Sequence, residues 1–143
     1  FTYMGFRYME LSGAAYQPGM IRAYALHTEM KRTGYFSCEN PLVQKLYENQ
    51  VWGQKSNYVE VPTDCPQRDE RMGYTGDGQV FALTGAYNFN TDAFWKNFLR
   101  DLELGQLDNT EGYVCATVPQ TGPAGSDLSA CWAGAMRSRF CRR

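Results

Sequence analysis

The sequence predicts a mainly helical fold with a short β segment at its N-terminus, and it predicts an incomplete domain. Extended patterns occupy roughly the first fifth of the chain, and three segments with helical spacing follow. Two strands alone are not stable, and three helices do not close a deep core. The chain also begins at Phe1 and not at Met. We therefore expect these 143 residues to be part of something larger.

Two extended segments open the chain. Residues 1–11 alternate aromatic and other side chains, and residues 21–29 also fit an extended backbone. Gly13 and the pair Pro18 and Gly19 interrupt the chain between them, as turn residues do. The pattern predicts two strands whose sheet partners lie outside the chain.

The first predicted helix begins at Asn40 and Pro41, because Asn is a good N-cap and Pro suits the first helical position. We expect it to run to about Asn57. Its apolar positions recur at helical spacing and define one face; they are Leu42, Val43, Leu46, Tyr47, Gln50 and Val51.

Two further helices are predicted. One starts near residues 75–77, with an inward face made of Val80, Phe81, Thr84 and Tyr87. The other starts at Thr91 and Asp92, where the aspartate suits the positive end of the helix dipole. Its apolar stripe, which we expect to be core, consists of Phe94, Trp95, Phe98, Leu99 and Leu102. Residues 112–118 form one more strand-like piece.

Composition excludes several classes of protein. The net charge of −1 argues against a nucleic-acid partner, and no apolar run approaches the ~20 residues that span a membrane. No metal-ligand cluster or phosphate loop is present, so no metal and no cofactor is expected. The five cysteines are odd in number and form no CxxC pair. Free thiols favour a bacterial cytoplasm, and a secreted or periplasmic location remains open.

The segment with the most chemical information is residues 61–77. It holds two arginines, Arg68 and Arg71, and four carboxylates, Asp64, Asp69, Glu70 and Asp77. Its prolines and glycines predict an irregular, conformationally fixed loop. Hydrolysis of a glycosidic bond needs two carboxyl groups, one protonated and one ionised. The alternative is a surface loop whose charges pair locally.

The order of the residues resembles a known family. Residues 62–77 (PTDCPQRDERMGYTGD), followed by QVFA at 79–82 and Tyr-Asn at 87–88, resemble the catalytic-domain signature of bacterial α-L-rhamnosidases, glycoside hydrolase family 78. Residues 5–8 look like the end of the family's β-sandwich, and residues 33–40 look like the lead-in to its first barrel helix. The resemblance covers nearly the whole chain to about Met136.

The resemblance implies a division of the chain. Residues 1–32 would end a β-sandwich-like domain, and residues 33–136 would be the N-terminal part of an (α/α)6 six-hairpin glycosidase domain. Residues 137–143 are an irregular, Arg-rich tail without resemblance to the family. We expect an artificial or irregular chain end there more than a site for an anionic partner.

The resemblance also assigns roles to residues. Glu70 matches the general acid of an inverting hydrolysis of terminal α-L-rhamnose. Residues that match or adjoin the sugar site are Asp64, Arg68, Asp69, Tyr74, Asp77 and Trp132. Tyr74 stands where the family usually has Trp, and Trp132 either lines the sugar site or belongs to the core.

Two departures from the family limit the expected activity. The general base lies much later in the family's barrel and has no counterpart here, and Gly134 replaces a sugar-binding aspartate. We therefore expect little or no activity from the chain alone. Its partners would be a rhamnose-containing glycoside or polysaccharide and the remainder of the barrel, with no nucleic acid and no membrane. The alternatives are an (α/α)6 glycosidase for another sugar and a non-catalytic sugar-binding or structural fragment.

Overall fold

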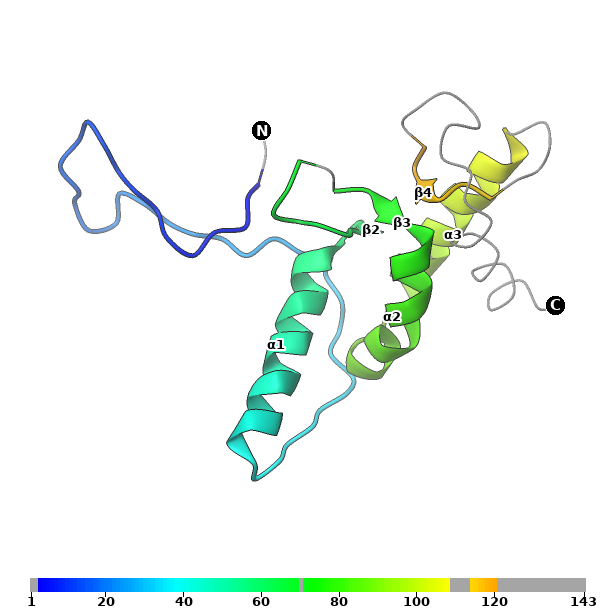
Figure 1. Ribbon diagram of the computed structural model, residues 1–143, viewed down its shortest axis with the longest axis horizontal. Helices are drawn as coiled ribbons and strands as arrows, with labels where there is room; N and C mark the ends of the chain where they lie inside the picture. Colours follow the sequence, from blue (N-terminus) through cyan, green and yellow to red (C-terminus); the bar gives the residue numbers. More distant parts are fainter. Residues whose placement is uncertain (1–2, 70, 109–113, 121–143) are drawn as a thin grey trace.

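The computed structural model describes residues 3–69, 71–108 and 114–120. Three helices dominate it, as predicted: α1 (Pro41–Asn57), α2 (Thr75–Asn88) and α3 (Asp92–Leu107). Four two-residue strands complete the described part: β1 (Tyr58–Val59), β2 (Val61–Pro62), β3 (Gly73–Tyr74) and β4 (Thr117–Val118). Helices α1 and α2 lie side by side, and the strands gather where α1 ends and α2 begins (Figure 1).

Helix α1 has the predicted boundaries. The Asn40 Oδ1 atom accepts hydrogen bonds from the backbone N–H groups of Leu42 at 3.0 Å and Val43 at 3.4 Å. These bonds satisfy two of the donors that a helix start leaves without partners, and Pro41 follows at the first position. The N-cap therefore determines where α1 begins.

The predicted apolar face of α1 is covered only near its C-terminal end. Leu42 is 80% exposed and Leu46 is also exposed, whereas Val51 is buried. The described residues therefore leave the first turns of this face open to solvent.

The predicted N-terminal strands are wrong within the described residues. Neither residues 3–11 nor residues 21–29 form a strand, and this segment extends away from the helices (Figure 1). Its end is joined to the helical part by backbone contacts: Thr28 N–H donates to Tyr58 O and Asn90 N–H donates to Lys31 O, both at 2.8 Å, and Arg32 forms an isolated bridge with Phe89. The physical reason is the absence of neighbouring strands, because two strands alone are marginal in water.

Helix α2 has the predicted start, but of its predicted inward face only Phe81 packs against the core. Val80 is 75% exposed, and Tyr87 and Thr84 are exposed as well. The buried positions are instead small or polar and include Gly78, Ala82 and Gly85. Small residues allow the backbone of α2 to approach its neighbours closely.

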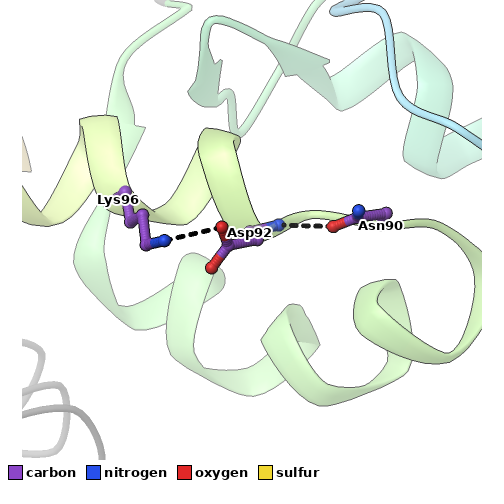
Figure 2. A network of polar contacts seen from close by, with 3 residues as sticks. All are labelled: Asn90, Asp92 and Lys96. Carbon is purple, nitrogen blue, oxygen red and sulfur yellow. Dashed lines mark hydrogen bonds and ion pairs between the residues drawn. The ribbon is translucent and has the colours of Figure 1, made fainter.

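Helix α3 matches its prediction, with Asp92 in its first turn and Phe94, Trp95, Phe98 and Leu102 buried. Figure 2 shows its N-terminus, where Asn90 Oδ1 accepts from the Asp92 N–H at 3.2 Å. Lys96 Nζ lies 2.7 Å from Asp92 Oδ2, one turn further on. Both side chains of this ion pair are exposed, so it contributes little to stability.

The core is an aromatic cluster between the helices and the strands. Its buried members are Tyr58, Ala82, Phe94, Trp95, Phe98, Leu102 and Val118. The Tyr58 ring stacks on Phe94, with centroids 4.3 Å apart and planes inclined by 5°. It also meets Trp95 and Phe81 edge-on at 5.9 and 6.2 Å. Tyr58 therefore connects the end of α1 to both other helices.

The strands form two antiparallel pairs. β1 and β2 make a tight hairpin with Glu60 at φ 65°, and β3 pairs with β4. Of the predicted strand at 112–118, residues 117–118 form β4 and residues 112–113 lie outside the described residues. No helix in the described part of the chain is long and apolar enough to span a membrane.

Gly85 provides a test of the close approach between α1 and α2. A Cβ atom at this position would lie 2.7 Å from Tyr58 Oη and 2.9 Å from Gln54 Nε2. We expect Gly85→Ala to lower the free energy of unfolding by about 1–3 kcal/mol through overpacking. Urea denaturation measures this change.

The matched control for Gly85 is Gly105→Ala in α3, where a Cβ would meet nothing within 4 Å. Alanine there should raise the free energy of unfolding by about 0.5–1 kcal/mol, because glycine is the poorer helix former. Equal effects at the two glycines would contradict the close approach.

Phe98 tests the core, since its side chain is 0% exposed. Removal of the ring leaves a cavity beside Trp95, so Phe98→Ala should lower the free energy of unfolding by about 3–5 kcal/mol in the same assay. Leu107→Ala is the control, because that side chain is 74% exposed at the end of α3. A loss at Phe98 no larger than the loss at Leu107 would place the core elsewhere.

Candidate active site

The loop of residues 64–72, called the acidic loop below, is closed at its base by hydrogen bonds between Asp64 and Met72. Asp64 N–H donates to Met72 O, and Met72 N–H donates to Asp64 Oδ1, both at 3.2 Å. Next to this pair, Thr63 and Gly73 form an antiparallel bridge. Residues 64–72, with residue 70 outside the described residues, are thus a closed loop between β2 and β3, as the prolines and glycines predict.

Gly73 allows the core to approach the base of the loop. A Cβ atom there would collide with Val118 O and would lie 3.0 Å from Phe98 Cε2. Any other residue at this position would therefore push β4 and α3 away from the loop.

Thr75 fixes the start of α2 directly after the loop. It is fully buried, and both its N–H and its hydroxyl donate to Ala116 O, at 2.8 and 3.0 Å. Asp77 lies two residues further, exposed in the first turn of α2. This position agrees with the helix start predicted near residues 75–77, and the charge of Asp77 suits the helix N-terminus.

A cleft of about 540 Å³ lies between α1 and the start of α2. Asp64 and Asp77 both line it, so the structure brings two of the predicted sugar-binding carboxylates to one surface. The other polar side chains of the lining are Gln50, Gln54, Asn57, Tyr58 and Thr63, and Pro62, Val80 and Phe81 add apolar surface. Carboxylates beside apolar and aromatic surface suit a ligand that has both hydroxyl groups and an apolar face.

The other predicted site residues of the loop lie apart from this cleft. Arg68 is exposed and donates from Nη2 to Cys65 Sγ at 2.7 Å, and Asp69 is exposed beside it. Tyr74 is half-buried in β3, paired with Thr117 of β4. Among the described residues, none of these three lines the cleft. Glu70 and Trp132 lie outside the described residues.

The sequence predictions missed the polar lining contributed by α1. Gln50, Gln54 and Asn57 recur at helical spacing, which was the signal available. Gln54 is buried; its Nε2 donates to Gly85 O at 3.1 Å, and its Oε1 accepts from Asn88 Nδ2 at 2.9 Å. This side chain therefore holds α1 against α2 beneath the cleft.

Within the described residues, no group of three or more His, Cys, Asp or Glu side chains could hold a metal ion. Cys38 is a free, exposed thiol and Cys65 is a free, half-buried one, whereas the buried Cys115 donates from Sγ to Gln120 Oε1 at 3.1 Å.

Three comparisons establish the family. The family model described as the bacterial alpha-L-rhamnosidase 6 hairpin glycosidase domain matches residues 31–139. The chain belongs to this family, as its motif predicted.

Individual relatives agree with the family match. An α-L-rhamnosidase of Formosa agariphila is 40% identical over 113 residues, and one of Streptomyces avermitilis is 37% identical over 131 residues. These alignments cover 76% and 90% of the chain but 12% of either relative, so the chain spans about an eighth of their length.

Solved structures give the same result. The native α-L-rhamnosidase of Aspergillus terreus superposes with a TM-score of 0.71 at 39% identity, over 76% of this chain and 12% of that one. The Streptomyces avermitilis enzyme in complex with L-rhamnose superposes with a TM-score of 0.64 at 41% identity, over 67% of this chain and 9% of that one.

Tyr58 lines the same cleft, and the pKa of its buried hydroxyl can be tested. Its side chain is 2% exposed, and its hydroxyl has no hydrogen-bond partner in the described part of the chain. Burial disfavours the phenolate and raises the pKa of Tyr58 well above its ordinary value.

The raised pKa sets the direction of the pH dependence. The unfolded chain releases the Tyr58 proton near pH 10, whereas the folded chain retains it, so stability falls as pH rises above about 10. Tyr58→Phe should remove this part of the slope and leave stability at pH 7 equal or higher, because an unpartnered buried hydroxyl is lost. Urea denaturation from pH 7 to 11 measures both effects. An unchanged alkaline slope would contradict the burial of the hydroxyl.

Proposed function

We propose that this chain is the first part of the catalytic domain of an inverting α-L-rhamnosidase, with Glu70 as its general acid. The observation that supports this most directly is that Asp64 and Asp77, from the two ends of the family signature, line one cleft. The relatives named α-L-rhamnosidases make terminal α-L-rhamnose the sugar that we assign to the site.

In the proposed architecture, the three helices described above belong to a larger domain. Residues 1–32 end a β-sandwich-like domain, and residues 33–136 contribute the first helices of an (α/α)6 barrel. The exposed apolar positions of α1 and α2, among them Leu42, Leu46 and Val80, support it, because a barrel supplies helices to cover them. The remainder of that barrel is the protein partner that we assign to the chain.

In the proposed mechanism, Glu70 donates its proton to the leaving glycosidic oxygen. A water molecule attacks the anomeric carbon from the opposite face, and a carboxylate from outside this chain takes a proton from that water. Asp64, Arg68 and Asp77 bind sugar hydroxyls, with Asp69 as a lesser contributor. Tyr74 and Trp132 provide aromatic surfaces for the apolar face of the sugar.

The chain alone should therefore have little or no activity, because it lacks a general base. A hybrid enzyme supplies the missing parts: this chain replaces the matching segment of the Streptomyces avermitilis relative. Hydrolysis of aryl α-L-rhamnosides is then measured for the isolated chain and for the hybrid. Comparable rates for the two would contradict the division of the site.

Glu70→Gln in the hybrid tests the general acid. We expect kcat to fall by about 10²–10⁴-fold, since glutamine cannot donate the proton. The loss should be larger for an alkyl rhamnoside than for a 4-nitrophenyl rhamnoside, whose leaving group needs less protonation. Glu48→Gln on the exposed side of α1 is the control and should leave kcat unchanged. Equal losses for both leaving groups, or none, would contradict the role of Glu70.

The alternatives predict different results in the same enzyme. A glycosidase for another sugar would prefer a different aryl glycoside in a substrate panel. A non-catalytic sugar-binding or structural segment would leave hydrolysis intact in the Glu70→Gln variant.

A further inference from the structure

Arg71 has a backbone conformation that requires support from its surroundings. It lies near the end of the acidic loop at φ 49°, in the left-handed region that non-glycine residues rarely occupy. Such a conformation persists only where neighbouring contacts hold it.

The side chain of Arg71 supplies such contacts in two directions. Toward the loop, its Nε donates to Arg68 O at 3.0 Å. Toward the N-terminal segment, its Nη2 donates to Tyr3 O, and its guanidinium carbon lies 4.3 Å from the centroid of the Tyr3 ring. A guanidinium can make all these contacts at once because it is planar and carries donors in a fixed fork.

These contacts join two segments that are distant in sequence. Tyr3 belongs to the N-terminal segment, 68 positions before Arg71. Gly5 approaches the same loop, since a Cβ there would lie 3.2 Å from Gln67 Cβ. Two residues of the segment therefore approach the loop, Tyr3 at Arg71 and Gly5 at Gln67.

We propose that Arg71 is a positioning residue and that Tyr3 is its partner, so that the N-terminal segment holds the acidic loop in its working conformation. The catalytic consequence rests on the function proposed above, because the loop carries Asp64, Arg68 and Glu70 in sequence. The hold of the N-terminal segment on the loop does not depend on that function. The segment before the first helix is then a component of the site and not only a connection to it.

Variants at residue 3 separate the ring from the backbone. Any substitution keeps the Tyr3 carbonyl. Tyr3→Leu removes the aromatic face under the guanidinium together with the hydroxyl, and Tyr3→Phe removes the hydroxyl alone. The matched control is Tyr8→Leu, because Tyr8 lies on the same segment and is 89% exposed.

Amide hydrogen exchange of the full chain tests whether Arg71 and Tyr3 hold the loop, and the experiment requires no enzymatic activity. The reporters are the N–H groups of Asp64, Arg68 and Met72, each bonded within the loop, and the reference is the Trp95 N–H in α3. Tyr3→Leu should accelerate exchange of the reporters about tenfold, with the reference unchanged, because loss of a cation–π contact opens the loop. Arg71→Lys should have the same effect, because an ammonium group lacks the fork of donors that reaches both Arg68 O and Tyr3 O. Tyr3→Phe and Tyr8→Leu should match the wild-type chain. Unchanged loop exchange in Tyr3→Leu would overturn the proposal.

Kinetics of the hybrid enzyme test the catalytic consequence. Tyr3→Leu should lower kcat about 10–100-fold with little change in KM, since misplaced catalytic groups act mainly on the transition state. Tyr3→Phe should have the same kcat as the hybrid with Tyr3. Accelerated loop exchange together with wild-type kcat would overturn the positioning role. A folded hybrid without α-L-rhamnosidase activity would instead refute the proposed function. The exchange experiment would still show whether Tyr3 and Arg71 hold the loop.

Discussion

The structure depends on the junction that Tyr58 makes between the three helices. Its ring stacks on Phe94 of α3 and meets Phe81 of α2 edge-on. Its hydroxyl lies so close to Gly85 that no larger side chain fits at that position. Gln54, one turn earlier, bonds to the backbone of α2 at Gly85. Since β2 and the acidic loop follow Tyr58 directly, this junction also sets the position of Asp64 relative to the start of α2. Burial of one tyrosine thus links core packing to the geometry of the cleft.

Local signals in the sequence predict what local physics controls. Asn40 and Pro41 place the start of α1, and the stripe from Phe94 to Leu102 gives α3, because capping and helical periodicity act over a few residues. The buried face of α2 could not be predicted in this way. Large apolar side chains such as Val80 predict an inward face, but α2 meets α1 through Gly85 and Asn88, whose importance appears only in three dimensions.

The same limit applies to the candidate site. Residue order in residues 62–77 predicts that Asp64 and Asp77 act together, and the cleft brings them to one surface. The polar side chains of α1 that share this cleft are separated from the motif in sequence, so no motif reports them. Arg71 shows a further difficulty: its partner Tyr3 lies 68 positions away, and its left-handed backbone has no sequence signature when the residue is not glycine. The N-terminal strands fail for the converse reason, because their pattern is local but their stability requires neighbouring strands.

The central claim is that the acidic loop and the first turn of α2 together form one half of a sugar site. A crystal structure of the hybrid enzyme with bound L-rhamnose tests it most directly. The account predicts sugar hydroxyls within hydrogen-bonding distance of the carboxylates of both Asp64 and Asp77. A rhamnose that is bound in the catalytic domain without contact to either carboxylate would contradict it.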